Sequence, residues 1–236
     1  GCNFRLAKKD LLVVFLLSLL RATTSFSLLI AYQNIATGVA STIHFMYPLA
    51  VSLAMMFFFH EKKSLLVMLA VLMSLFGAAL LSSGELEAKS GHTIVGLVAA
   101  CISVFSYGGY IIGVRTTRAA QINSTVLTCY VMGMGAVFYL IGAMATSGLH
   151  LVTDGYIWLI ILGLALPATA ISNITLVRAI KYAGPTLTSI LGAMEPLTAV
   201  VIGVFVFKEL FTLNSAIGVL LILLAVGMVV FRKQKS

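Results

Sequence analysis

The chain has 236 residues, of which 61% are hydrophobic and 9% are charged. Because soluble domains carry roughly 25% charged residues, this composition excludes a soluble domain and indicates an integral membrane protein. The net charge of +8 could suggest nucleic-acid binding, but the basic residues fall between apolar stretches, where they record membrane topology. The three cysteines have unrelated spacings, which predicts small buried side chains and neither a disulfide nor a metal site.

Eight apolar stretches are long enough to cross a bilayer, since a spanning helix needs about 20 mainly apolar residues. Short connections join them, so no separate soluble domain is expected. The sequence predicts an all-α integral membrane protein with eight transmembrane helices. In chain order these are residues 11–31, 38–59, 64–83, 93–114, 124–146, 156–177, 185–207 and 213–231.

The basic residues lie almost entirely on one side of this eight-helix map. Loops rich in Lys and Arg face the cytoplasm, so we expect a multi-pass protein of the cell (inner) membrane with both chain ends cytoplasmic. The opposite side holds Lys89 and Lys208. The residues on the cytoplasmic side are Arg5, Lys8, Lys9, Lys62, Lys63, Arg115, Arg118, Arg178, Lys181, Arg232, Lys233 and Lys235.

A pattern of residues recurs 148 positions along the chain. An odd number of predicted crossings separates the two copies, so they run in opposite directions through the membrane. Inverted repeats that meet around proline-interrupted helices are typical of secondary transporters. The matched pairs are Ala31 and Ala179, Ser41 and Ser189, Pro48 and Pro196, Leu49 and Leu197, and Glu61 and Glu209.

The same offset predicts how the chain is divided. Shifting the last three helices back by 148 positions places them on the first three, whereas residues 93–146 find no counterpart. We therefore expect a partial first repeat of three helices in residues 1–90 and a complete second repeat of five helices in residues 91–236. A complete protein would then carry two more helices upstream, ten in all; a genuine eight-helix protein is the alternative.

Three passages resemble the EamA-like members of the drug/metabolite transporter superfamily. In the third, Glu195-Pro196 lies in mid-helix and Glu209 follows. The resemblance implies two inverted five-helix halves around a central cavity, and movement of small metabolites or drugs, often outward. It also implies that the helices at residues 11–31, 38–59, 93–114, 156–177 and 185–207 line the cavity. The passages are residues 31–61 with Tyr47-Pro48-Leu49, residues 99–115, and residues 179–209.

Two charged side chains lie deep in predicted spans, Arg21 and Glu195. A charge at the bilayer centre costs about 2.5–3.5 kcal/mol on insertion scales, so both are functional candidates. Each lies ten residues from the cytoplasmic start of its helix, roughly 15 Å deep at about 1.5 Å per residue, so the two could pair. Three interpretations stay open: a permanent pair that holds the halves together, contact with substrate or proton, and snorkelling at a lipid-facing surface. As substrate contacts, Arg21 would bind a carboxylate or phosphate, and Glu195 an ammonium group or a proton.

Prolines are expected to break three of the helices. Pro48 and Pro196 each remove a backbone bond in mid-helix, which frees the carbonyls of His44 and Gly192, and Pro167 interrupts a third helix. Such breaks persist in membranes where they are buried in protein or line a wet cavity; a plain kink is the alternative. The predicted substrate-binding residues are Arg21, His44, Tyr47, Tyr107, Asn173 and Glu195.

The sequence favours a secondary transporter that works by alternating access, with export as the direction that the resemblance favours. Its expected partners are a small-molecule substrate and the lipid bilayer, with protons as a further candidate and no nucleic acid; no cofactor is expected. A sugar-nucleotide or phosphate-ester carrier would need more intramembrane Lys and Arg than the single Arg21. A membrane-embedded enzyme would need a catalytic constellation, and a pore would need repeated polar rings; neither pattern is present. The sequence also lacks a Walker A motif for ATP.

Overall fold

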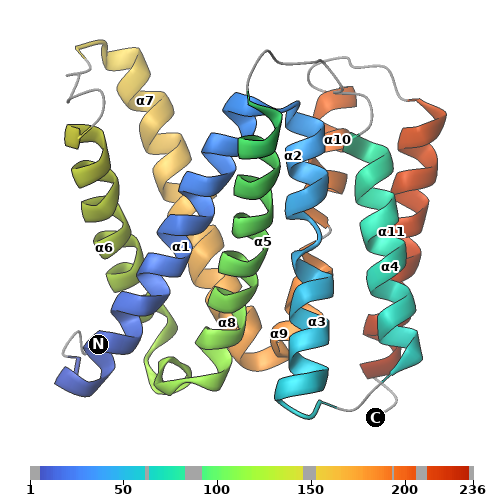
Figure 1. The fold of residues 1–236 in the computed structure, drawn as a ribbon, viewed down its shortest axis with the longest axis horizontal. Helices are drawn as coiled ribbons and strands as arrows, with labels where there is room; N and C mark the ends of the chain where they lie inside the picture. Colours follow the sequence, from blue (N-terminus) through green and yellow to red (C-terminus); the bar gives the residue numbers. More distant parts are fainter. Residues whose placement is uncertain are drawn as a thin grey trace. The chain divides into compact units, whose positions relative to one another are not determined.

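A computed structural model describes residues 6–61, 64–82, 92–145, 153–192, 194–205 and 212–233 of the chain. These residues form helices and short connections without a β-strand (Figure 1). The elements are α1 (Lys8–Asn34), α2 (Thr37–His44), α3 (Tyr47–Phe58), α4 (Leu65–Ser82), α5 (Thr93–Thr116), the 3-10 helix η2 (Arg118–Gln121), α6 (Ser124–Ala145), α7 (Gly155–Gly163), the π-helix η3 (Leu164–Ile171), α8 (Ser172–Ala183), α9 (Pro185–Leu191), α10 (Met194–Phe205) and α11 (Leu213–Lys233).

The all-helical membrane architecture is confirmed. In the described residues, five helical segments are long and apolar enough to span a membrane: Lys8–Asn34, Thr37–Phe58, Thr93–Thr116, Ser124–Met144 and Gly155–Ala183. Two other predicted spans form α4 and α11, whose apolar parts are shorter. The remaining span, at residues 185–207, is divided between α9 and α10.

The helices form two compact units. The first unit comprises Gly1–Ala22 and Gly113–Gly184, and the second comprises Thr23–Ile112 and Pro185–Ser236. Since the divisions fall inside α1 and α5, these two helices contribute a part to each unit. The predicted division into residues 1–90 and 91–236 rests on the sequence repeat rather than on contacts within the fold, so it stays a prediction.

The first unit contains α6, α7, η3 and α8 with the adjoining parts of α1 and α5. Phe15 of α1 meets Phe138 of α6 edge to face, with ring centroids 5.6 Å apart. A Cβ atom at Gly113 would lie 2.8 Å from the Leu17 side chain, so α1 and α5 approach closely here. Small residues permit such close approach between membrane helices.

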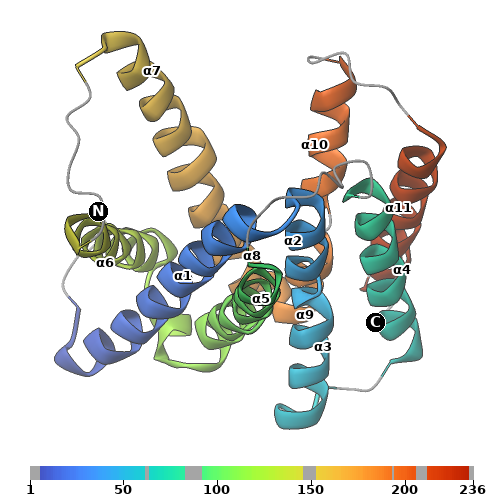
Figure 2. The same ribbon diagram turned by 45° about the horizontal axis from the view of Figure 1, so that its top comes forward.

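The second unit is built around two pairs of packed helices. α4 and α11 lie side by side along their length, and α3 packs on α9 (Figures 1 and 2). Ala70 and Val71 of α4 join Ile190 of α9 and Ala225 of α11 in a buried core. These contacts hold the end of α9 inside the unit.

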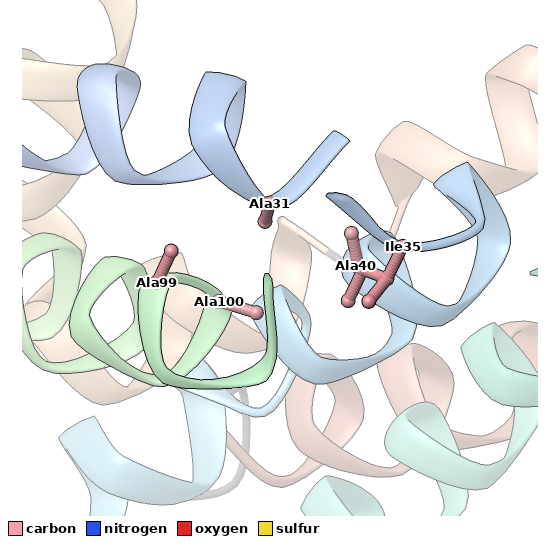
Figure 3. Close-up of a cluster of buried hydrophobic side chains, with 5 residues drawn as sticks. All are labelled: Ala31, Ile35, Ala40, Ala99 and Ala100. Carbon is pink, nitrogen blue, oxygen red and sulfur yellow. The ribbon is translucent and has the colours of Figure 1, made fainter. Parts of the chain in front are cut away.

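A second core of small side chains joins α1, α2 and α5. Ala31 and Ile35 come from the end of α1, Ala40 from α2, and Ala99 and Ala100 from α5 (Figure 3). Because these side chains are mostly alanine, α2 and α5 can lie close together. The next turns of these two helices carry His44 and Ser103, which are thereby brought within reach of each other.

The helix bounds recur at the offset of the sequence repeat. α4 begins at Leu65 and α11 at Leu213, and α2 begins at Thr37 and α9 at Pro185, each pair 148 positions apart. The ends of α2 at His44 and of α9 at Leu191 are separated by one residue less than this offset. The inversion of the repeat stays a prediction. Glu209 lies outside the described residues, as do Arg5, Lys62, Lys63, Lys89, Lys208, Lys235 and Cys2.

The prediction that the cysteines are buried is wrong for Cys101 and Cys129, which are both exposed. Cys101 shares its side of α5 with exposed Ile102 and Phe105. A thiol behaves as a small hydrophobic group, so it fits the apolar surface of a membrane helix as well as a protein core. An apolar sequence around a cysteine therefore does not show that its side chain is buried.

Candidate functional site

The two prolines matched by the repeat lie in the first turns of new helices. Sequence analysis placed Pro48 and Pro196 in mid-helix, but α2 ends at His44 before α3 begins at Tyr47, and α9 ends at Leu191 before α10 begins at Met194. Proline has no N–H to donate, and the first turn of a helix is where that donor is not needed. The new helices therefore begin one residue before Pro48 and two residues before Pro196, and the breaks lie before those starts.

His44, at the end of α2, is held by a hydrogen bond from its ring to α5. His44 Nδ1 lies 2.9 Å from Ser103 Oγ, and Ser103 Oγ donates to the Ala100 carbonyl at 2.6 Å. Since a hydroxyl has one hydrogen, which is used on Ala100, Ser103 accepts from His44 Nδ1–H. In neutral His44 the lone pair is then on Nε2.

Four aromatic side chains form a cluster that we call the ring cluster: His44, Tyr47, Tyr107 and Tyr110. The His44 ring centroid is 5.6 Å from that of Tyr47 and 5.4 Å from that of Tyr107. Tyr47 meets Tyr107 edge to face at 4.7 Å, and Tyr107 stacks with Tyr110 at 6.4 Å. Pairs in this range contribute about 0.5–1.5 kcal/mol each beyond their buried area. The cluster fixes the break between α2 and α3 against α5.

Tyr47 also contacts the other broken helix. A Cβ atom at Gly192 would lie 1.8 Å from the Tyr47 hydroxyl oxygen, and Tyr47 is only 1% exposed. The phenol thus occupies the space that any side chain at position 192 would need. Sequence analysis named Gly192 only for its freed carbonyl and did not include Gly192 or Ser103 among the site residues. The offset of 148 that matches Gly192 with His44 could have pointed to Gly192.

Glu195 lies in the first turn of α10, where its side chain is exposed. It lies three residues after Gly192, whose side-chain space the Tyr47 hydroxyl takes. A carboxylate is favoured at the positive end of a helix. An accessible carboxylate beside a buried phenol can bind a cationic group or a proton.

The first unit holds the other two predicted binding residues. Arg21 Nη2 donates to Asn173 Oδ1 at 3.5 Å, and Asn173 Nδ2 donates to the Thr169 carbonyl at 2.7 Å. Asn173 is buried, while Arg21 is half-buried. The amide therefore orients the guanidinium, whose planar fork suits a carboxylate or phosphate.

Pro167 lies within the π-helix η3. The wider turn accommodates a residue without an N–H, and the Thr169 hydroxyl donates to the Leu164 carbonyl at 2.9 Å. π-helical turns inside α-helices are frequent at functional sites. The sequence predicted a break here; the helical path instead continues through η3 into α8 with a changed hydrogen-bond pattern.

The six predicted binding residues thus fall into two groups. His44, Tyr47, Tyr107 and Glu195 belong to the second unit, and Arg21 and Asn173 to the first. Pairing of Arg21 with Glu195 stays a prediction. In the part of the chain that the structure describes, no group of three or more His, Cys, Asp or Glu residues could hold a metal ion.

Comparison with known proteins gives one family and one fold. The family model of the EamA-like transporter family matches residues 94–231. No curated protein matches the chain. A protein crystal structure matches with a TM-score of 0.81 and 18% sequence identity, over 99% of this chain and 80% of the other. At that identity the likeness shows the fold alone.

Proposed function

The chain belongs to the EamA-like transporter family, and from this premise we propose that it is a secondary transporter that moves a small metabolite or drug-like molecule by alternating access. The family and the apolar helices make it a multi-pass membrane protein. Export, and an inner-membrane location with both described ends cytoplasmic, are parts of this proposal.

The contact between two broken helices in the second unit carries the proposal. The Tyr47 hydroxyl of α3 takes the space beside Gly192, which follows the end of α9, and Glu195 is the second residue of α10. Broken helices inside a membrane are tolerated where protein buries them or where they line a wet cavity, and transporters form their sites at such breaks. The ring cluster and Glu195 supply a polar, partly aromatic surface at this point.

Each group of residues favours one kind of chemical group on the substrate. Glu195 binds an ammonium group or a proton. Arg21, oriented by Asn173, binds a carboxylate or phosphate. A carrier of sugar nucleotides or other phosphate esters, the second candidate, is less well supported because Arg21 is the only basic residue deep in a predicted span.

Ligand-induced thermal stabilisation in detergent tests the site. A panel of amino acids, organic acids and amphipathic amines should contain one class that stabilises the protein by about 2.7 kcal/mol at a hundred times its Kd. Because each substitution removes a charge-assisted contact, Glu195→Gln or Arg21→Leu should weaken binding by about tenfold or more.

Lys9→Gln is the control, since it removes an exposed charge in the first turn of α1. We expect it to bind as the unaltered protein does. Equal affinity in all three variants would show that Arg21 and Glu195 do not contact the ligand, and the proposed site would be wrong.

A further inference from the structure

A polar cavity of about 320 Å³ lies in the first unit, between the start of α1 and the loop that joins α5 to α6. Both segments lie at the same end of the helices in Figure 1. The volume is at the lower end of the range of about 300–1,000 Å³ that small-ligand pockets have, so it suits a small polar group. The cavity is lined by Leu6, Asp10, Arg118, Gln121, Ile122, Asn123 and Val126, and none of these belongs to the proposed transport site.

The loop side of the cavity is held in place by the rest of the first unit. Lys181 Nζ, on α8, donates to the Ile122 carbonyl, and Ala119 of η2 is buried. Asn123 Oδ1 accepts from the Thr125 N–H at 2.9 Å and so caps α6. Because Oδ1 is used in this way, the Asn123 amide presents N–H donors to the cavity. The lining is therefore a built site on a fixed loop.

The cavity lies at the level where the apolar spans end. Asp10 is in the first turn of the span Lys8–Asn34, and Arg118 lies in the connection between the spans of α5 and α6. Lipid headgroups occupy this level of a bilayer. Leu11 and Leu12, next to Asp10, are exposed. A lipid with its headgroup in the cavity would therefore lay its acyl chains along these leucines.

The two charged side chains in the cavity have opposite signs. Asp10 is half-buried and Arg118 is exposed. A carboxylate accepts hydrogen bonds from a primary ammonium group, and a guanidinium pairs with a phosphate through its planar fork. We propose that the cavity binds the headgroup of phosphatidylethanolamine, with the ammonium group on Asp10 and the phosphate on Arg118. This site is separate from the proposed transport site, so the inference does not depend on the transported compound.

Two other classes of lipid fit the lining less well. A choline headgroup carries methyl groups in place of the hydrogens on its nitrogen, so it has no N–H to donate to Asp10. A glycerol headgroup has no ammonium group, so its phosphate charge is brought near Asp10 without compensation. The exposed Lys8 and Lys9 attract any anionic lipid through charge alone. A preference for ethanolamine over glycerol therefore reports on Asp10.

Lipid-induced thermal stabilisation of the delipidated protein in detergent measures this binding. Phosphatidylethanolamine, phosphatidylcholine and phosphatidylglycerol with the same short acyl chains are titrated separately, and each Kd follows from the shift of the unfolding midpoint. The ethanolamine lipid should bind about tenfold more tightly than either of the others, because a charge-assisted hydrogen bond distinguishes it. Free phosphoethanolamine should bind more weakly, since only a lipid contacts the exposed leucines. Equal Kd values for free phosphoethanolamine and the lipid would overturn the assignment to a lipid.

Two variants separate the roles of the two charges. Asp10→Asn removes the acceptor of the ammonium group, so the three lipids should then bind with similar Kd values. Arg118→Gln removes the phosphate contact, so all three should bind about tenfold more weakly while the ethanolamine lipid stays the tightest. Arg178→Gln is the matched control, because it removes an exposed arginine of α8 that does not line the cavity. It should leave the three Kd values unchanged.

Asp10→Glu separates a binding effect from a folding defect at this position. It keeps a carboxylate, so it should keep the preference for ethanolamine. Similar Kd values for the three lipids in the unaltered protein, or an unchanged preference in Asp10→Asn, would overturn the proposal.

Discussion

Gly192→Ala is expected to abolish the native packing of α3 on α9. The added Cβ would lie 1.8 Å from the Tyr47 hydroxyl oxygen and 3.1 Å from the Ser189 carbonyl oxygen. The Tyr47 ring is only 1% exposed and is held between the rings of His44 and Tyr107. Overpacking of this kind typically costs about 1–3 kcal/mol, and more where backbone atoms must shift. The measurement is the thermal unfolding midpoint in detergent, together with ligand binding.

A second substitution tests whether Tyr47 is the cause. Tyr47→Phe removes the oxygen that the new methyl group would meet, so the double variant with Gly192→Ala should recover a large part of the lost stability. Gly133→Ala is the matched control, because an added Cβ there meets nothing within 4 Å. It should be neutral or slightly stabilising, since alanine favours a helix by about 1 kcal/mol over glycine. Equal losses in Gly192→Ala and Gly133→Ala would show that the Tyr47 contact is not what limits position 192.

Gly77→Ala is expected to separate α4 from α11. A Cβ atom at Gly77 would lie 2.8 Å from the Gly218 carbonyl oxygen and 2.9 Å from the Ile222 side chain. Because the first of these is backbone, the helices themselves must move apart, and the close contact that small residues allow between membrane helices is lost. We expect a loss of about 2 kcal/mol or more, measured as a lower unfolding midpoint.

Gly135→Ala controls for the general effect of adding a methyl group to a membrane helix, because its Cβ would have no neighbour within 4 Å. Gly77→Ala should also change the free energy of ligand binding by less than it lowers the free energy of unfolding, since α4 and α11 lack the predicted binding residues. Unchanged stability in Gly77→Ala would contradict the close approach of these two helices.

The helices were predictable because hydropathy alone decides which stretches can cross a bilayer. The spans at residues 93–114 and 124–146 became α5 and α6 with ends that differ by at most two residues. No backbone N–H or C=O can stay unpaired in lipid, so an apolar run of this length has little alternative to a helix.

The contacts in the site depended on tertiary packing that the sequence does not display locally. His44 and Tyr47 were predicted on one helix and Tyr107 on another. The contact between the two helices at this point follows from the alanine-rich core between α2 and α5. The breaks precede Pro48 and Pro196 because a proline has no N–H to donate, so the carbonyl four residues before it, that of His44 or Gly192, loses its helical partner. That Tyr47 occupies the space beside Gly192 could be read only from the packed helices.

Counterflow in proteoliposomes tests the central claim most directly. Vesicles loaded with the compound that stabilises the protein should accumulate the labelled compound from outside, because a carrier exchanges its substrate without net flux. Thr186 Oγ1, at the start of α9, donates to Glu61 Oε2, just after the end of α3, at 2.6 Å. In a protein without other cysteines, a disulfide between Glu61→Cys and Thr186→Cys would lock these two helix ends together, so it should stop this exchange, and a reductant should restore it. Exchange that continues while the disulfide is intact would contradict alternating access through α3 and α9, and binding without any exchange would contradict the assignment as a transporter.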